Sequence, residues 1–315
     1  MSSQDITYYD KYDYDYSQFW KDRDYENFSE TNVLKKILKN STGNWILDVG
    51  GSYGRLTDLY YQKFHNCVLC DYSEKALEQA REDFKKRGIK NVNLVAANVY
   101  NLPFKTATFD SALMVRVIHH LEDWDTAISE VSRILSSKAL FVLEFANKHN
   151  IKAILRAILK FNFKYIFSGE PSKIETSKSP EGTEATVPGI IYNYSPRHIR
   201  NLLVSHEINI KRSYCLSFLR IPFIKKFVPS VLLKVVEKFF QVVLGWTKIT
   251  PSIIYQSYKK NGLSQQHFSD VEDLLCCPKC KGELDRKPSS LLCSKCNISF
   301  NIKNKVYDLR YPAPE

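Results

Sequence analysis

The sequence predicts an α/β fold in which helices cover both faces of a Rossmann-like, mostly parallel sheet, followed by a small metal-binding module. Apolar strands and helices alternate between residues 44 and 147, which is typical of a parallel sheet. A buried strand at 45–49 runs into a glycine-rich turn, where such sheets bind their ligands. Two Cys-x-x-Cys pairs near the C-terminus predict the separate module.

Length and composition fit one large domain and one small one. The chain has 315 residues, 44% of them hydrophobic, and a net charge of +11. We expect an N-terminal helical cap over 1–40, whose residues Trp20, Tyr25 and Phe28 pack over a ligand or serve as core anchors. The main domain covers 41–262, with a basic, apolar insertion at 148–250, and the metal-binding module covers 271–315.

The first strand and turn predict a site for a nucleoside-type ligand. Ile46, Leu47 and Val49 form the strand, and a tight turn and a helix over 55–61 follow. The turn contains Gly50, Gly51 and Gly54, because backbone must come close to a ligand there. A second strand ends at Asp71, seventeen residues after the last of these glycines, and its carboxylate can accept hydrogen bonds from a ribose.

The type of ligand follows from what the turn lacks and from Asp48. No Gly-Lys-Ser/Thr follows the glycines, which excludes a phosphate-binding P-loop. Asp48 at the strand end would face the pyrophosphate of a dinucleotide. S-adenosylmethionine has no phosphate and carries an amino group, so it suits this carboxylate better.

Residues 40–147 resemble the class I S-adenosylmethionine-dependent methyltransferases. The branch that looks closest includes quinone-biosynthesis C-methyltransferases and certain tRNA wobble-uridine methyltransferases. The shared features are Asp48–Gly54, Asp71, Asn98-Val99, Leu102–Phe104, Phe109-Asp110, and Arg116–Leu121 before a helix at 126–135. The resemblance implies a seven-stranded methyltransferase sheet, and it implies that S-adenosylmethionine is held by Asp48, Gly50, Gly51, Gly54, Asp71, Tyr72, Asn98, Val99, Val115 and Arg116.

Two positions depart from the family pattern. Ser52 stands where the family has a second loop glycine, and Asn98 where it has Asp. The amide oxygen of Asn98 can still accept a hydrogen bond from an adenine amino group. Weakened or lost donor binding remains an alternative.

His119 and His120 follow the fourth strand at its carboxyl end, where the methyl acceptor is expected. A near-neutral imidazole suits removal of an acceptor proton, and His120 is the preferred base. The alternative is that one histidine caps the next helix and the other packs. Members that methylate amino groups carry an Asn/Asp-Pro-Pro-aromatic motif here, whereas this chain has Met114–Val117, which disfavours amino acceptors.

The segment 148–260 carries the positive charge, with 19 Lys and Arg against six Asp and Glu. It contains two apolar-basic helices. The helix over 151–167 aligns Lys152, Arg156 and Lys160, and the helix over 229–246 confines its polar groups, Lys234, Glu237, Lys238 and Gln241, to one stripe. Core packing, a cover over a lipophilic acceptor that touches the bilayer, and nucleic-acid contact all remain open.

Between and after these helices the sequence predicts further elements. Residues 168–189 have the composition of a mobile loop, either a lid or simple surface disorder. Ser195 and Pro196 begin a helix, as N-cap and first helical residue. Two antiparallel strands at 208–216 and 253–258 close the sheet.

The C-terminal module has the spacing of a structural zinc site. Cys277, Cys280, Cys293 and Cys296 can close a tetrahedron of thiolates around zinc, and Cys276 is a bystander. The module resembles the small zinc-ribbon protein that activates tRNA, rRNA and release-factor methyltransferases, which implies that it packs in cis on the main domain. Cys67 and Cys70 lie on a strand, point to opposite faces and are buried apolar residues.

Together these observations predict an S-adenosylmethionine-dependent methyltransferase. The acceptor is an oxygen or carbon of a small, lipophilic metabolite. Alternatives are a tRNA or another translation component, and a non-catalytic donor-fold binding module. The N-terminus lacks the apolar run of a signal peptide, and no stretch reaches 18 apolar residues, so we expect a cytoplasmic protein with contact to a membrane surface as an option.

Overall fold

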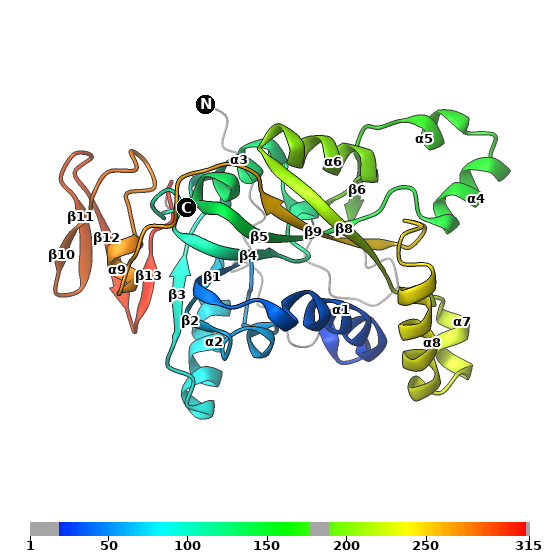
Figure 1. Ribbon diagram of the computed structural model, residues 1–315, viewed down its shortest axis with the longest axis horizontal. Coiled ribbons are helices and arrows are strands. Elements are labelled where there is room, and N and C mark those ends of the chain that lie inside the picture. Colours follow the sequence, from blue (N-terminus) through cyan, green and yellow to red (C-terminus); the bar gives the residue numbers. More distant parts are fainter. Residues whose placement is uncertain (1–18, 177–188, 313–315) are drawn as a thin grey trace.

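The structure is a computed structural model that describes residues 19–176 and 189–312. Within these residues one sheet has the order β10-β11-β12-β13-β3-β2-β1-β4-β5-β9-β8 (Figure 1). The predicted Rossmann-like sheet is its larger part, and it is confirmed. It comprises β1 (Gly43–Val49), β2 (Phe64–Asp71), β3 (Val92–Ala96), β4 (Phe109–Met114), β5 (Leu135–Ala146), β8 (Ile208–Leu216) and β9 (Ser252–Lys259).

Strands β1 to β5 run parallel to one another, and β9 is antiparallel to both of its neighbours, β5 and β8. Helices cover both faces, because each buried strand presents apolar side chains to both sides. On one face lie α3 (Trp124–Ile134) and α6 (Pro196–Ser205), and on the other α1 (Asp24–Ile37) and α2 (Glu74–Arg87) (Figure 1). As predicted, α6 begins at Pro196, and the Ser195 hydroxyl accepts the His198 N–H at 3.1 Å.

The helix predicted over 55–61 is wrong. Turns and a short 3₁₀ helix, η4 (Thr57–Leu59), connect the glycine turn to β2. Because β2 is parallel to β1, the nine residues after Gly54 must run back along the whole length of the seven-residue strand β1, about 23 Å. Nine residues of α-helix would rise only about 14 Å, which is too short for this connection. Other 3₁₀ helices are η3 (Leu38–Asn40), η5 (Val99–Asn101) and η6 (Ile118–His120).

Two insertions leave the sheet at the same edge. The first contains α4 (Ile151–Leu159), α5 (Phe163–Phe167), β6 (Ser172–Thr176) and β7 (Gly189–Asn193), and the second contains α7 (Pro222–Phe227) and α8 (Ser230–Val243). The helix predicted over 151–167 is broken, because Phe161 has a φ of 53° and Asn162 caps α5. Part of the loop predicted over 168–189 forms the β6–β7 ladder, and residues 177–188 lie outside the described residues.

The C-terminal module extends the sheet at the opposite end from these insertions (Figure 1). It consists of α9 (Val271–Leu274), β10 (Asp285–Lys287), β11 (Ser290–Cys293), β12 (Ile298–Lys303) and β13 (Val306–Asp308). Strand β13 pairs in parallel with β3, placing Val306 opposite Leu94 and Asp308 opposite Ala96. The module therefore covers an edge that the main domain would otherwise leave unpaired.

Candidate functional site

The glycine turn closes over the end of β2. The N–H groups of Gly50 and Gly51 donate to the Cys70 carbonyl at 2.7 and 3.2 Å. Gly50 has a φ of +68°, and a Cβ there would lie 2.3 Å from Val117 Cγ2. Gly54 has a φ of +81°. Both residues must be glycine for the backbone to follow this path, which is what the sequence predicted of the turn.

Asp71, at the end of β2, holds this turn. Its carboxylate accepts the Ser52 N–H at 2.8 Å and the Ser73 N–H at 2.9 Å. Ser52 has a φ of 51°, the left-handed backbone that a glycine would adopt more readily. The chain therefore keeps the loop conformation despite its departure from the family pattern, and Asp71 fixes it.

Asp48 is buried at the end of β1. Its carboxylate accepts a hydrogen bond from the Tyr60 hydroxyl at 3.0 Å. Burial raises the pKa of this carboxyl to about 7, although the Tyr60 hydrogen bond and the Arg55 charge oppose the shift. Asp48 therefore changes charge near neutral pH, beside the glycine turn.

Arg116, after β4, joins a charged cluster that the sequence analysis missed. Its N–H donates to the buried Glu144 at 2.9 Å, and its guanidinium lies 3.6 Å from the buried Glu30 of α1. Glu30 also pairs with Arg55, whose guanidinium stacks 3.8 Å from the Trp20 ring. Glu30 and Glu144 lie far apart in the sequence, so only folding brings them together.

Of the three predicted cap aromatics, only Trp20 lies at this turn. Tyr25 donates to Glu237 of α8, and Phe28 lies near Lys234 and Lys238. Helix α1 therefore connects the donor side of the sheet to the second insertion.

The remaining predicted donor residues lie along the ends of β2 to β4. The Asn98 amide oxygen accepts the Tyr100 N–H at 2.9 Å, and its nitrogen donates to the Tyr311 carbonyl at 3.5 Å. The Tyr72 carbonyl accepts from Arg310 at 3.4 Å. Val115 is buried and Val99 is half-buried. The C-terminal segment thus reaches the adenine side of the predicted site.

His119 and His120 lie together in η6, with ring centroids 4.2 Å apart. Burial is the main cause of their lowered pKa values, to about 4 for His120 and further for His119, and the Arg116 charge adds to it. His119 Nδ1 is buried and has no hydrogen-bond partner among the described residues. Both imidazoles are therefore neutral at physiological pH.

An aromatic cluster that the sequence did not reveal lies beside the histidines. Trp124 has ring centroids of Tyr192, Tyr194 and His198 within 5.7 Å. The Tyr194 hydroxyl donates to the Ile118 carbonyl at 2.9 Å, which ties the cluster to η6. Its residues come from α3, from β7 and the residue after it, and from α6, so sequence spacing could not indicate the cluster.

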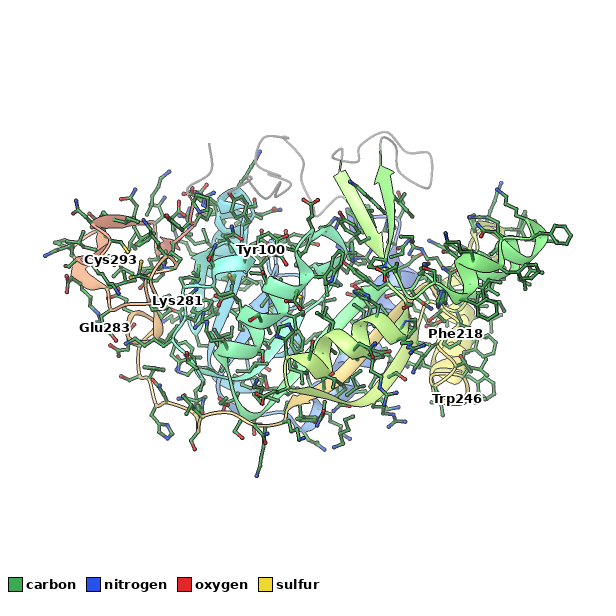
Figure 2. The ribbon with its side chains drawn as sticks, turned by 90° about the horizontal axis from the view of Figure 1, so that it is seen from above. Tyr100, Phe218, Trp246, Lys281, Glu283 and Cys293 are labelled. Atoms are coloured by element: carbon green, nitrogen blue, oxygen red, sulfur yellow. The ribbon has the colours of Figure 1, made fainter. Side chains whose placement is uncertain are left out.

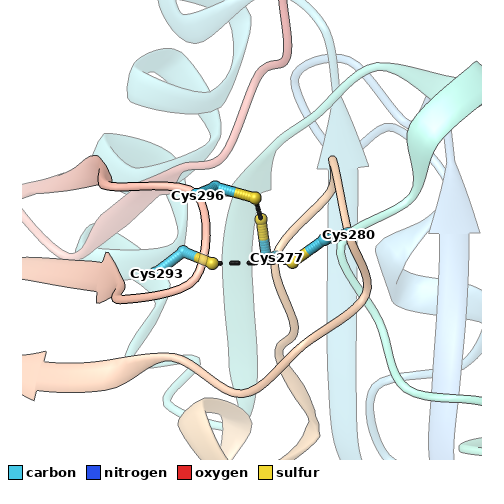
Figure 3. Close-up of side chains that lie close together, drawn as sticks. All are labelled: Cys277, Cys280, Cys293 and Cys296. Carbon is cyan, nitrogen blue, oxygen red and sulfur yellow. Dashed lines mark hydrogen bonds between the residues drawn. The ribbon is translucent and has the colours of Figure 1, made fainter.

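The four predicted zinc ligands converge (Figure 3). The sulfur atoms of Cys277, Cys280, Cys293 and Cys296 all lie within 4.8 Å of one another, with Cys280 and Cys293 3.6 Å apart. A tetrahedral zinc with bonds of about 2.3 Å needs sulfurs about 3.8 Å apart, so this donor set fits zinc. Cys276 lies outside this four-cysteine cluster.

The other cysteines are buried. Cys67 and Cys70 belong to different apolar clusters on the two faces of β2, as predicted. The Cys276 N–H donates to the Pro103 carbonyl at 2.9 Å, which ties the module to the main domain.

Two ion pairs add to this junction. Lys281 lies 2.7 Å from Glu130, and Lys105 lies 2.8 Å from Glu283; Figure 2 labels Lys281 and Glu283 on the module side.

Comparison with known proteins identifies the family. Residues 47–143 match the family model described as a methyltransferase domain. An uncharacterized protein of Methanocaldococcus jannaschii is 30% identical over 189 residues, which are 59% of this chain and 70% of that protein. The chain belongs to the class I S-adenosylmethionine-dependent methyltransferases.

Two further similarities are informative about this methyltransferase. The ubiquinone/menaquinone biosynthesis C-methyltransferase UbiE of Escherichia coli is 32% identical over 126 residues, 38% of this chain and 50% of UbiE. The match thus spans only half of UbiE. A chain of the complex formed by the Haloferax volcanii Trm112 methyltransferase activator has the same fold, with a TM-score of 0.54 and 12% identity, over 83% of this chain and 100% of that chain.

Among the described residues, no helix has both the length and the apolar character needed to cross a membrane.

Proposed function

We propose that this protein transfers a methyl group from S-adenosylmethionine to an oxygen or carbon atom of a small, lipophilic acceptor. The observation that carries the proposal is the neutral His119–His120 pair beside the aromatic cluster of Trp124, Tyr192 and Tyr194. The histidine pair follows β4, at the carboxyl ends of the strands where Asp71 and the glycine turn lie, and the Tyr194 hydroxyl ties the cluster to it. Aromatic rings suit an apolar acceptor, and a neutral imidazole can accept its proton.

The donor site would be formed by the backbone of Gly50–Gly54, with Asp71 directed at the ribose hydroxyls and Asn98 at the adenine. When bound, S-adenosylmethionine supplies an electrophilic methyl group, and transfer leaves S-adenosylhomocysteine. When its carboxylate is ionised, Asp48 would attract the amino group of the donor. Arg116, held by Glu30 and Glu144, would orient a carboxylate of the donor or acceptor.

His120 would hold the proton that an acceptor hydroxyl or activated carbon loses as its new bond to the methyl carbon forms. Positioning and exclusion of water supply most of the remaining rate, because the methyl group is already activated. The similarity to UbiE, named for C-methylation in quinone biosynthesis, supports an apolar acceptor.

A second candidate is a methyltransferase of the translation apparatus. The four-cysteine module, its strand pairing with β3, and the fold shared with a chain of a Trm112 activator complex favour it. Binding to tRNA phosphates should weaken steeply as salt increases, whereas binding of a lipophilic metabolite should not.

The first test is calorimetric titration of the zinc-loaded protein with S-adenosylhomocysteine. We expect binding that Asp71→Ala abolishes and that Asp83→Ala, an exposed carboxylate of α2, leaves unchanged. An acceptor screen with methyl-labelled donor then compares lipid extract with bulk tRNA. Label in the lipid extract supports the proposal, and label in tRNA supports the second candidate.

Absence of binding by the unmodified, zinc-loaded protein would contradict both candidates. It would leave the non-catalytic donor-fold module as the interpretation, with Ser52 and Asn98 as its sequence basis.

A further inference from the structure

Helix α8 is attached to the fold by its polar side. Glu237, at the middle of the helix, is completely buried, and its carboxylate accepts hydrogen bonds at 2.8 and 3.1 Å from the Ser217 and Phe218 N–H groups. It also accepts from Tyr25 and Ser29 of α1 and, at 3.0 Å, from Gln241. This orientation is fixed by a saturated network of hydrogen bonds, and a buried carboxylate cannot leave it without cost.

The opposite side of α8 is apolar and faces outward. Phe239 is 61% exposed and Val242 70%, and Trp246, three residues after the helix ends, is 73% exposed. A helix that packs on a core turns its apolar side inward, as α3 does with Ile128, Val131 and Ile134. The orientation of α8 is the reverse, so its apolar side is available to something outside the described chain.

The first insertion presents a second exposed apolar surface at the same end of the molecule. Leu159 is 80% exposed and Phe161 82%, at the end of α4. In Figure 1 α4 and α5 lie above α7 and α8 at the same end of the molecule, and in Figure 2 the labelled Trp246 lies at the end opposite Cys293. We call this surface the apolar end. Its principal members are Leu159, Phe161, Phe167, Phe227, Phe239 and Trp246.

The charges around the apolar end are mostly positive. Residues 151–167 contain four Lys and Arg and no acid, and residues 218–248 contain six Lys and Arg and one acid, the buried Glu237. Lys225 and Lys234 pair with Glu26 and Asp24 of α1, at 2.8 and 2.6 Å. The exposed basic side chains beside the apolar residues include Arg156, Lys160, Lys164, Lys226 and Lys238.

We propose that the apolar end docks on the surface of an anionic lipid bilayer, with its Phe, Leu and Trp side chains in the interface and its Lys and Arg side chains at the headgroups. Exposed apolar and aromatic groups flanked by cations are the features that place a protein at an anionic membrane interface without spanning it. Trp in particular favours the headgroup level.

The apolar end leaves the sheet on the same side as the predicted donor-binding residues. Ala146 of β5 pairs with Ser252 of β9, and Ser252 pairs with Leu216 of β8. Both insertions therefore leave the sheet at the carboxyl end of β5, the edge where Asp71 and Arg116 lie. If the acceptor is lipophilic, as the proposed function has it, docking would bring this edge of the sheet close to the bilayer in which the acceptor dissolves. The docking itself does not depend on catalysis.

A second copy of the chain is a poorer occupant. A two-fold interface brings identical patches together, so it would place the cations of one apolar end against those of another. Anionic lipid provides the opposite charge.

The experiment is flotation of the full-length, zinc-loaded protein with vesicles. We expect binding to vesicles of phosphatidylcholine mixed with phosphatidylglycerol and little binding to pure phosphatidylcholine. Phe239→Ser/Trp246→Ser should weaken partitioning about tenfold or more, because each exposed aromatic loses its burial in the interface. Lys160→Glu/Lys164→Glu should remove the preference for anionic lipid.

The matched control is Val204→Ser/Leu263→Ser, which removes two exposed apolar side chains away from the apolar end. It should partition like the unmodified protein. Failure of the unmodified protein to bind anionic vesicles, or equal binding by the Phe239/Trp246 variant, would overturn the proposal. So would a dimer in sedimentation velocity that this variant abolishes. Titration with S-adenosylhomocysteine, run on the same samples, tests the proposed function separately.

Discussion

The two ends of the sheet are finished in opposite ways. At the β3 end, the C-terminal module adds β13 as a paired strand and exchanges ion pairs such as Lys281–Glu130 with the main domain. At the other end, α8 buries a carboxylate, Glu237, and exposes Phe239, and Trp246 just after the helix is exposed as well. The chain satisfies its own hydrogen bonds at the first end and leaves apolar surface uncovered at the second.

The difference shows that apolar content alone does not say what a helix does. Helices α3 and α8 are both amphipathic, yet only α3 directs its apolar side at the core. What decides the orientation of α8 is its polar stripe: the hydrogen-bond partners of Glu237 lie on α1 and after β8, and Gln241 bonds to Ser29 of α1. A polar stripe can thus be the anchor of a helix rather than its solvated side.

The largest expected effect is at the module end. Removing zinc by chelation, or replacing Cys293 by Ser, should unfold β10 to β13, because metal binding supplies on the order of 10 kcal/mol to modules of this size. Hydrogen exchange should show loss of protection in these strands while β1 and β5 stay protected. Cys276→Ser, next to the cluster but outside it, should retain one zinc per chain.

The same treatment examines whether the module end supports the donor site. Arg310 contacts the Tyr72 carbonyl, and the Tyr311 carbonyl accepts from Asn98, so the zinc-free protein should bind S-adenosylhomocysteine more weakly. Unchanged zinc content in Cys293→Ser, or unchanged protection without zinc, would contradict the assignment of the four cysteines.

The next effect concerns the other end. Glu237→Ala should reduce the free energy of unfolding by about 3–5 kcal/mol, because it leaves the Phe218 N–H group and the Tyr25 hydroxyl without their acceptor, in a buried position. Urea unfolding followed by fluorescence measures the change. Lys238→Ala, the exposed neighbour, should alter stability by no more than about 0.5 kcal/mol. Equal stability of the two variants would show that α8 is not held by its polar side.

The sequence predicted the central sheet well because its signals are local. The apolar runs of β1 and β2, the turn at Gly50–Gly54, and the spacing from Cys277 to Cys296 each lie within a short segment. The prediction of a helix over 55–61 failed because residue preferences do not report the distance that a connection must span.

Other features depend on contacts between distant segments. The polar stripe of α8 was visible in the sequence, but its direction was not, since Tyr25 lies 212 residues before Glu237. The same holds for the Arg116, Glu30 and Glu144 cluster and for the aromatic rings around Trp124. Residues of such sites have no common spacing that could reveal them.

The smallest expected effect concerns Asp48 at the end of β1, between the two ends of the sheet. Asp48 has its pKa raised to about 7 by burial, so it is mostly protonated at pH 6 and mostly ionised at pH 8. If the ionised carboxylate attracts the donor's amino group, affinity for S-adenosylhomocysteine should increase about tenfold over this range. Calorimetric titration at several pH values measures it.

The direction of the pH dependence distinguishes Asp48 from the other titrating groups. Without ligand, a raised carboxyl pKa means that the folded protein binds more protons than the unfolded chain, so this group lowers stability as pH rises from about 4 to about 7. The affinity for S-adenosylhomocysteine, in contrast, should increase as pH rises. His120, with a pKa of about 4, is already neutral throughout this window. Asp48→Asn should abolish the pH dependence of affinity. Phe239→Ser/Trp246→Ser should keep it, because the apolar end does not contribute to the proposed donor site. An affinity that does not change with pH in the unmodified protein would exclude Asp48 from donor binding.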